Sequence, residues 1–248
     1  MGILKTTISG SPRLNNHAHV VNELGRAIVN GAFQTGETLP NDAQLESKFN
    51  VSRTVLREAM KTLSAKGLIV ARARIGTRVT DPSEWNFFDK DVLEWHLDTG
   101  FDRSFIMNLT DIRLSLEPFA AQLAAARISS EDSKTLSDLC LKMELATEND
   151  EFALADLKFH QVLLHASGNP FMFSISNIIE AALANTFQIS GPTESRVHQA
   201  QSVAAHREIA DAVSSGNGTA AAAAMHKVIS TGRDRVLKAI DSQSITGS

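Results

Sequence analysis

Residues 41–80 constrain the fold most, because two short helical patterns, a sharp turn and two β-rich runs follow one another there with almost no connecting chain. Asn50 permits a sharp turn between the two helices, and Ser52 is placed to cap the second helix. Gly67 ends that helix, and the two β-rich runs after it predict a hairpin. With the helical stripe that precedes this segment, the order of elements predicts a winged helix-turn-helix domain at residues 17–80.

Charge divides the chain into two parts. Residues 1–80 hold 11 Lys and Arg against 5 Asp and Glu, whereas residues 81–248 hold 13 against 23. The net charge of −4 for the whole chain hides this difference. Lys and Arg near phosphates release condensed counterions, so a basic domain favours a polyanionic partner. The sequence therefore predicts two domains with different partners, and double-stranded DNA is the expected partner of the first.

The second helix of the predicted motif carries side chains that suit the recognition of DNA bases. Arg53 can form two hydrogen bonds with a guanine edge, and Arg57 lies one turn further along the same side. In the hairpin, Gly76 would let the backbone approach DNA closely. Because one recognition helix reads only a few base pairs, we expect a homodimer on a palindromic operator. The expected DNA-binding residues are Ser52, Arg53, Thr54, Arg57, Arg74 and Gly76.

Helical periodicity without strand signals fills residues 103–241, so the expected fold class is mainly α. The helices are expected near residues 103–127, 131–148, 151–167, 170–190, 195–215 and 219–241. An apolar stretch with both tryptophans joins this half to the first domain and is expected to pack against one domain. The remaining segments are a flexible tail at residues 1–16, this aromatic linker at residues 81–102 and a second tail at residues 242–248.

These motifs resemble the GntR superfamily of bacterial regulators. The resemblance is carried by Gly36-Glu37-Thr38-Leu39-Pro40, Val51-Ser52-Arg53-Thr54-Val55-Leu56-Arg57-Glu58-Ala59, Gly67-Leu68-Ile69 and the wing glycine Gly76. The helical second half resembles the FadR subfamily, whose C-terminal effector-binding domain, the FCD-type sensor, is an antiparallel helical bundle. Residues 103–241 would form that bundle, and the resemblance implies a small organic acid as the effector.

Asp156 and His160 lie four residues apart, so one helical face carries both and both can point at one ion. A solvent-facing ion pair also explains such a spacing. The resemblance implies a metal site, because relatives use one Asp and three His, and it adds His206 as a ligand. The third histidine position is occupied by Val228, which cannot ligate, and His226 is about 200° away around the helix. We expect one divalent transition metal, zinc or similar, on the three remaining residues. Alternatively, these residues hydrogen-bond the effector directly.

Arg113 precedes Glu117 by four residues on the first helix of the second half. The resemblance implies that this arginine clamps the carboxylate of the effector, and an intrahelical Arg–Glu pair is the alternative. The stretch at residues 85–95 further resembles regulators of galactonate and related sugar-acid catabolism, which makes a sugar acid the expected effector. The expected effector-binding residues are Arg113, Glu117, Asp156, His160 and His206.

Two function classes fit these observations. The first is a ligand-responsive repressor of a sugar-acid catabolic operon, which the acid releases from its operator. The second is a metal-dependent helical enzyme with an accessory nucleic-acid-binding head. No G-x-x-x-x-G-K-[ST] or H-E-x-x-H motif occurs, so the first class is favoured and no catalytic residue is expected. No signal peptide or membrane-spanning run is present, and Cys140 alone can form neither an intrachain disulfide nor a cysteine zinc cluster. We therefore expect a soluble, cytoplasmic protein without a membrane partner.

Overall fold

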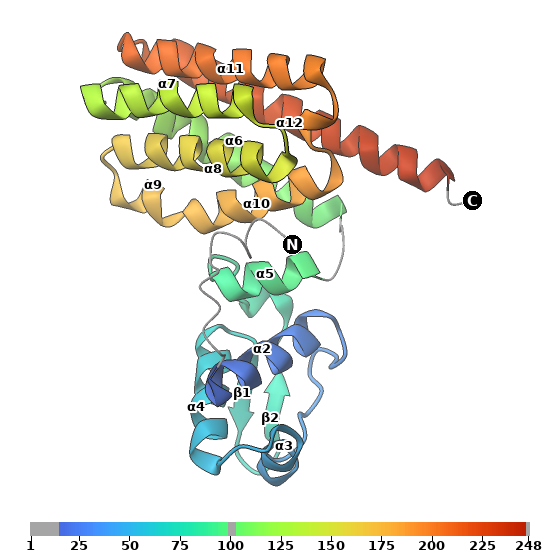
Figure 1. The fold of residues 1–248 in the computed structure, drawn as a ribbon. Helices are drawn as coiled ribbons and strands as arrows, with labels where there is room; N and C mark the ends of the chain where they lie inside the picture. Colours follow the sequence, from blue (N-terminus) through green and yellow to red (C-terminus); the bar gives the residue numbers. More distant parts are fainter. Residues whose placement is uncertain (1–14, 99–102, 247–248) are drawn as a thin grey trace. The chain divides into compact units, whose positions relative to one another are not determined.

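A computed structural model of the chain describes residues 15–98 and 103–246. These residues form an N-terminal unit and a C-terminal unit, each with its own core (Figure 1). Residues 1–14, which make up most of the expected N-terminal tail, lie outside the described residues, as do residues 99–102 of the expected linker. Among the described helices, none is both long and apolar enough to cross a membrane.

The N-terminal unit begins with three helices, α2 (Asn16–Val29), α3 (Asp42–Phe49) and α4 (Arg53–Ala65). Asn41 and Gln44 form a reciprocal capping box at the start of α3. Asn50 ends α3 in the left-handed conformation, with φ at 50°. The Ser52 hydroxyl accepts a hydrogen bond from the amide of Val55 and so caps α4. The predicted helix-turn-helix is confirmed.

A two-stranded antiparallel sheet follows, formed by β1 (Ile69–Arg72) and β2 (Gly76–Val79). The chain before α3 runs along the free edge of β2: the Leu39 amide donates to the Thr77 carbonyl at 2.8 Å, and the Val79 amide donates to the Glu37 carbonyl at 3.0 Å. The sequence predicts only a turn at residues 35–40. Its pairing with β2 depends on contacts far apart in the chain, which a short Gly- and Pro-containing segment does not reveal.

The expected aromatic linker contains the short helix η1 (Pro82–Glu84) and the helix α5 (Lys90–Asp98), which packs on α2. The ring of Trp95 is fully buried in the core that α2, α4 and the sheet share. Its Nε1 donates to Oδ1 of Asn22 at 3.0 Å, and a Cβ at Gly25 would lie 2.3 Å from the ring. The structure thus places the described part of this segment in the core of the N-terminal unit.

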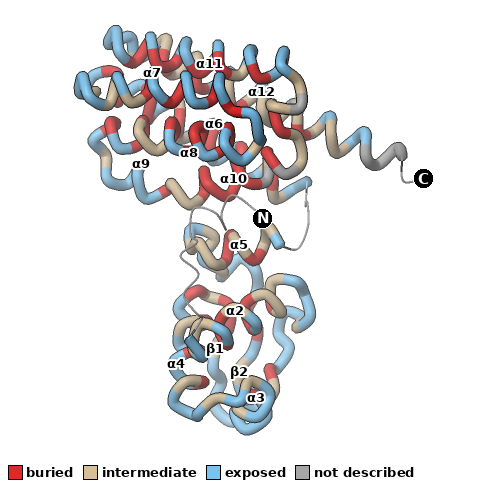
Figure 2. The backbone as a smooth tube through the Cα atoms, viewed as in Figure 1, coloured by how far each residue is buried: buried red, intermediate tan, exposed pale blue. Residues whose placement is uncertain are grey.

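The C-terminal unit consists of helices joined by turns, and its described residues include no strand. Helix α6 packs against α8, α10, α11 and α12, and α7 packs against α8 and α11 (Figure 1). Buried residues occupy the helix faces that meet inside this bundle (Figure 2). The elements are α6 (Arg103–Ala125), α7 (Ser130–Leu145), α8 (Asn149–Ala166), α9 (Pro170–Ser174), α10 (Ser176–Ile189), η2 (Pro192–Glu194), α11 (Arg196–Ser214) and α12 (Gly218–Thr246).

Two expectations for this unit differ from the structure. The single helix expected at residues 170–190 is interrupted at Ile175, which ends α9 and begins α10. The last helix was expected to end at residue 241, but α12 continues to Thr246, so residues 242–246 extend a helix instead of forming a tail. No Gly or Pro occurs between residues 233 and 246, and the chain therefore offers no stop signal there.

Candidate functional site

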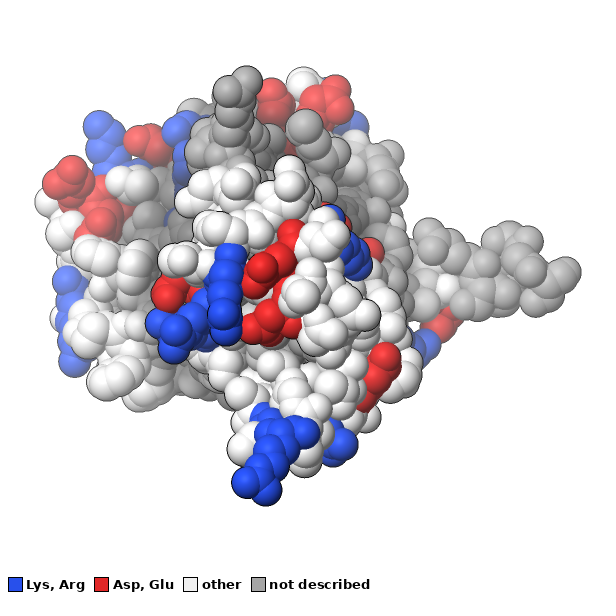
Figure 3. Space-filling view, turned by 90° about the horizontal axis from the view of Figure 1, so that it is seen from below, with Lys and Arg blue, Asp and Glu red and all other residues white. Residues whose placement is uncertain are grey.

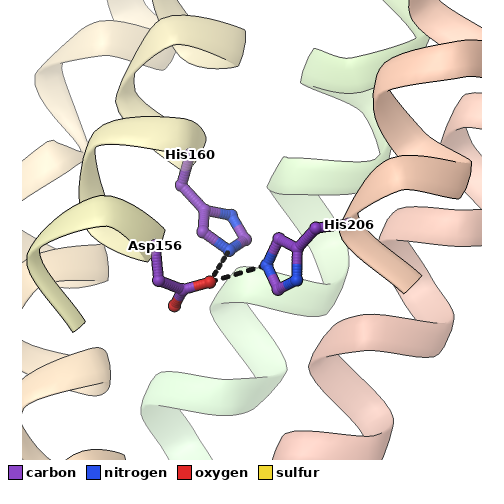
Figure 4. Close-up of side chains that lie close together, drawn as sticks. All are labelled: Asp156, His160 and His206. Carbon is purple, nitrogen blue, oxygen red and sulfur yellow. Dashed lines mark ion pairs between the residues drawn. The ribbon is translucent and has the colours of Figure 1, made fainter. Parts of the chain in front are cut away.

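Three side chains converge in the core of the C-terminal unit (Figure 4). Asp156 and His160 project from neighbouring turns of α8, and His206 approaches them from α11. Nε2 of His206 lies 2.6 Å from Oδ1 of Asp156, and Nε2 of His160 lies 3.8 Å from the same oxygen. All three residues are buried. One candidate ligand atom from each residue lies within 4.8 Å of the other two.

The other ring nitrogen of each histidine faces an acceptor. Nδ1 of His206 lies 2.8 Å from the backbone carbonyl of Ser202, and Nδ1 of His160 contacts Oε2 of Glu117. A carbonyl and an ionised carboxylate only accept hydrogen bonds, so each Nδ1 carries the proton. In a neutral imidazole the lone pair is then on Nε2. With both rings neutral, as in a metal complex, the Nε2 atoms would direct their lone pairs to the space beside Asp156.

The donor set fits a divalent metal ion. Oδ1 of Asp156 and the Nε2 atoms of His160 and His206 are buried and make no hydrogen bond of normal geometry with the residues that the structure describes, as is also true of Nδ1 of His160 and Oε2 of Glu117. Ion pairs connect these atoms, with Asp156 and His206 at 2.6 Å. Buried polar atoms in proteins rarely lack hydrogen bonds, so their convergence at one point fits a shared ligand. Two imidazoles and a carboxylate are ligands that zinc and similar ions accept. The outer contacts from Glu117 and Ser202 match the usual support of metal-bound histidines.

The charge of the buried carboxyls Asp156 and Glu117 must be offset by neighbouring groups. Burial alone would raise the pKa of the Asp156 carboxyl, but His206, His160 and Arg113 together outweigh burial and lower that pKa to about 2. Burial would likewise lower the pKa of His206, and Asp156 instead raises it. Glu117 has a pKa of about 2 because Arg113 and His160 outweigh its burial. With both carboxyls ionised, Arg113 offsets only one charge. A second cation, either an imidazolium or a metal ion, is needed.

A cavity of about 830 Å³ opens beside the cluster. Arg113, Asp156, His160 and His206 all line it, and the volume is typical of pockets for small ligands. Its lining contains five Lys and Arg and three Asp and Glu, an excess of positive charge. Polar groups are also present along the wall: Thr110, Thr186, Ser190, His198, Gln201 and Ser202.

Glu117 is placed differently from the other residues expected to bind the effector. It is buried but does not line the cavity. Its Oε1 lies 2.5 Å from Nε of Arg113, and its Oε2 contacts His160. The intrahelical Arg–Glu pair therefore exists in the structure, and Arg113 belongs to this pair and to the cavity wall at once.

The structure separates the two candidates for a third histidine position. Val228 lines the cavity together with the three candidate ligands, whereas His226 is exposed, contacts Ser230 and is not part of the wall. Val228 thus shares a wall with the candidate ligands, and its side chain cannot bind a metal.

Several cavity residues were not singled out from the sequence. Thr110 precedes Arg113 by three residues and Ser202 precedes His206 by four, so helical spacing could have placed both on the same faces. His198 is exposed and also lines the cavity.

The residues expected to bind DNA lie at the start of α4 and in the hairpin. Arg53, Thr54 and Arg57 are exposed, and the buried face of the same helix carries Leu56. The hydroxyl of Ser52 is used in the cap of α4 described above.

The hairpin turn between β1 and β2 has an unusual backbone. Arg74 and Gly76 both have positive φ, at 65° and 109°, and both are exposed. Arg72 and Arg78 are exposed in the flanking strands, which makes this wing basic. Seen from the α3 end of the N-terminal unit, several Lys and Arg side chains lie on the near surface, and acidic side chains lie beside the central ones (Figure 3).

Comparison with protein families gives a match for each unit. The model described as "Bacterial regulatory proteins, gntR family" matches residues 16–79, and the model described as "FCD domain" matches residues 108–231. The second of these covers half of the chain.

Two relatives come from Escherichia coli K12. The chain is 33% identical to the uncharacterized HTH-type transcriptional regulator YieP, over 83% of this chain and 89% of YieP. It is 30% identical to the galactonate operon transcriptional repressor, over 90% of this chain and 97% of that repressor. Among solved structures, Lar of Listeria monocytogenes matches with a TM-score of 0.57 and 18% identity, over 90% of this chain and 96% of Lar. At that identity the match shows the fold alone.

Proposed function

This chain belongs to the GntR family of bacterial transcription regulators with an FCD domain, and from that premise we propose how it binds DNA and senses its effector. It is a ligand-responsive DNA-binding regulator and not an enzyme. The alternative expectation, a metal-dependent enzyme with an accessory nucleic-acid-binding head, is therefore wrong. Because bacterial DNA is its target, we propose that it acts in the cytoplasm.

DNA recognition is assigned to the exposed side of α4 and to the wing. Arg53, Thr54 and Arg57 would read bases and contact phosphates in the major groove, because the start of a recognition helix enters that groove. Arg74 and Gly76 would bring the wing to the neighbouring backbone, and Ser52 would act through the cap that fixes the start of α4. A homodimer would place two such units on a palindromic operator.

The effector is assigned to the cavity beside Asp156, His160 and His206, and this cluster is the observation that carries the proposal. An organic acid fits the positive lining, with Arg113 facing its carboxylate. The hydroxyl, amide and imidazole groups along the wall would satisfy the hydroxyls of a sugar acid, which are costly to bury unpaired. A relative is named for the galactonate operon, so an aldonate similar to galactonate is the proposed class.

One divalent transition metal, zinc or a similar ion, is the proposed cofactor. Asp156, His160 and His206 would hold it. Three protein ligands leave positions open, and a metal with open positions supplies a Lewis acid that can take an oxygen of water or of the effector. The Nδ1 contacts of both histidines orient their rings for this task. Direct hydrogen bonds from the same residues to the effector are the competing arrangement.

The regulator is proposed to repress a sugar-acid operon and to leave its operator when the acid binds. A test begins with selection of binding sites from a random DNA pool, followed by fluorescence anisotropy on the enriched sequence. We expect a palindromic site, bound by a dimer, and release by galactonate or a related aldonate. Binding of a monomer to a single half-site would contradict the dimer, and insensitivity to a full panel of aldonates and uronates would contradict the effector class.

The same assay distinguishes the two arrangements at the cluster. If a metal takes part, removal of the metal with a chelator weakens the response to the acid, and added Zn²⁺ restores it. A full response in metal-free protein would favour direct hydrogen bonding and would contradict the metal as a necessary cofactor.

A further inference from the structure

Glu117 contacts both Arg113 and the candidate metal ligand His160 but does not line the cavity. One of its carboxylate oxygens lies 2.5 Å from Nε of Arg113, and the other contacts Nδ1 of His160. The side chain is only 2% exposed, so water does not compete for either contact. Sequence alone assigned Glu117 to the effector, and its absence from the cavity wall calls for a different role.

The contact with His160 controls which ring nitrogen is free. An ionised carboxylate accepts but does not donate a hydrogen bond, so Glu117 keeps the proton of His160 on Nδ1. Nε2 is then left unprotonated on the side of Asp156, where it can bind a metal. The carboxylate also restricts rotation of the ring, because its other oxygen is tied to Arg113 on the same helix.

We propose that Glu117 is a positioning residue of the metal site, which raises metal affinity by fixing the tautomer and orientation of His160, and that it does not bind the effector itself. The inference rests on the proposed metal site at Asp156, His160 and His206. It adds that the Glu117 carboxylate contacts two residues at once: Arg113, which is expected to face the effector, and His160, a candidate metal ligand. Metal and effector are therefore predicted to influence each other through one side chain.

The test measures Zn²⁺ affinity of the full-length protein by competition with a chelator of known affinity. Outer-sphere substitutions of this kind typically cost about 10–100-fold in metal affinity. We expect a loss of about that size in Glu117→Gln, since an amide can donate to Nδ1 and no longer enforces one tautomer. His226→Ala is the matched control, because His226 is exposed and does not line the cavity, and its Zn²⁺ affinity should equal that of the wild type.

Glu117→Gln leaves Arg113 without its partner and can destabilise the bundle for that reason alone. A second comparison avoids the destabilisation caused by an unpaired Arg113. In an Arg113→Met background the guanidinium is absent, so adding Glu117→Gln no longer creates an unpaired buried cation. The double variant should again bind Zn²⁺ about 10–100-fold more weakly than Arg113→Met alone. Equal Zn²⁺ affinities in the two proteins would overturn the proposal.

A measurement on metal-free protein separates this proposal from the metal site itself. Nitrogen-15 NMR of labelled histidines reports which ring nitrogen of His160 carries a proton. We expect protonation of Nδ1 in the wild type and a mixture of tautomers in Glu117→Gln. If the wild type does not bind Zn²⁺, the proposed metal site is wrong and the function of Glu117 in metal affinity falls with it, whereas the tautomer result still decides whether Glu117 orients His160. An unchanged tautomer in Glu117→Gln would overturn that orienting role.

Discussion

The Nε2 atom of His206 lies 2.6 Å from Oδ1 of Asp156, although the two residues belong to different helices, α11 and α8. This approach completes a site that α8 alone cannot form. Without a metal, an imidazolium at His206 offsets the Asp156 charge, and Asp156 raises the pKa of His206 against the effect of burial. A divalent ion would occupy the same place and supply the same compensation.

Loss of His206 should therefore remove metal binding. His206→Ala deletes one of three ligands, so we expect Zn²⁺ affinity to fall further than the ~10–100-fold typical of outer-sphere changes. Isothermal titration with Zn²⁺ gives the affinities. The exposed His226 supplies the control, and His226→Ala should behave as the wild type. A His206→Ala protein that binds Zn²⁺ with wild-type affinity would contradict the assignment of the ligands.

Replacement of Val228 offers a test by gain of function. Val228 lines the cavity with the three candidate ligands, and the resemblance to related regulators implies a histidine at this position. Val228→His should add a fourth ligand and strengthen Zn²⁺ binding, because structural zinc sites usually have four protein ligands. The same titration measures the change. If Zn²⁺ affinity stays the same or decreases, Val228 does not face the bound ion.

Only part of this site could be predicted from the sequence. Helical spacing places Asp156 and His160 on one face, because the period of an α-helix is fixed. Spacing in the sequence does not predict that His206 lies beside these two residues, because the packing of α8 and α11 in one bundle is a tertiary property. Only the family resemblance suggested His206 as a ligand. The contact of Glu117 with His160 was not predicted for a related reason: its spacing from Arg113 explained one carboxylate oxygen, and the partner of the other lies on a different helix.

The attachment of residues 81–98 to the N-terminal unit can be tested with two glycines. Gly67 and Gly36 have nearly the same backbone φ, at 82° and 81°, but only Gly67 is crowded, with a Cβ position 2.1 Å from the Glu84 carbonyl oxygen. Gly36→Ala should cost about 1–2 kcal/mol in the free energy of unfolding through backbone strain alone. Gly67→Ala should cost more, because Glu84 and its neighbours must also move.

Tryptophan fluorescence during chemical denaturation measures this difference. Both tryptophans, Trp85 and Trp95, lie in the N-terminal unit, so the signal reports that unit. Equal destabilisation by the two substitutions would show that residues 82–85 are not held against the end of α4 in solution.

Local signals predicted most helices of the fold, and the differences arose where long-range packing decides. Ser52 is a helix cap that can be identified from neighbouring residues, and it acts as expected. Residues 36–39 join β2 through pairing with residues far along the chain, which leaves no pattern in so short a segment. The interruption at Ile175 likewise has no Gly or Pro to mark it.

Arg53 and Lys61 of α4 should contribute differently to DNA binding. Arg53→Ala should cost about 1–3 kcal/mol in operator affinity and relax the preference for one base pair, because a bidentate contact with a base is lost. Lys61 is also exposed on α4, and Lys61→Ala should weaken all DNA sequences alike and reduce the salt dependence of binding. Anisotropy titrations on operator and random DNA at several salt concentrations separate the two effects. Unchanged operator affinity in Arg53→Ala would exclude α4 as the recognition helix.

The central claim is that an organic acid in the cavity of the FCD domain and operator DNA on the winged helix-turn-helix domain compete through the protein. Thermodynamic linkage requires that each ligand weaken the binding of the other by the same factor. Isothermal titration of galactonate, or of the tightest-binding aldonate, into Zn²⁺-loaded protein with and without saturating operator measures this factor directly. We predict weaker binding of the acid when operator is present, by the same ratio with which the acid weakens operator binding. Identical affinity for the acid in both titrations would contradict the account.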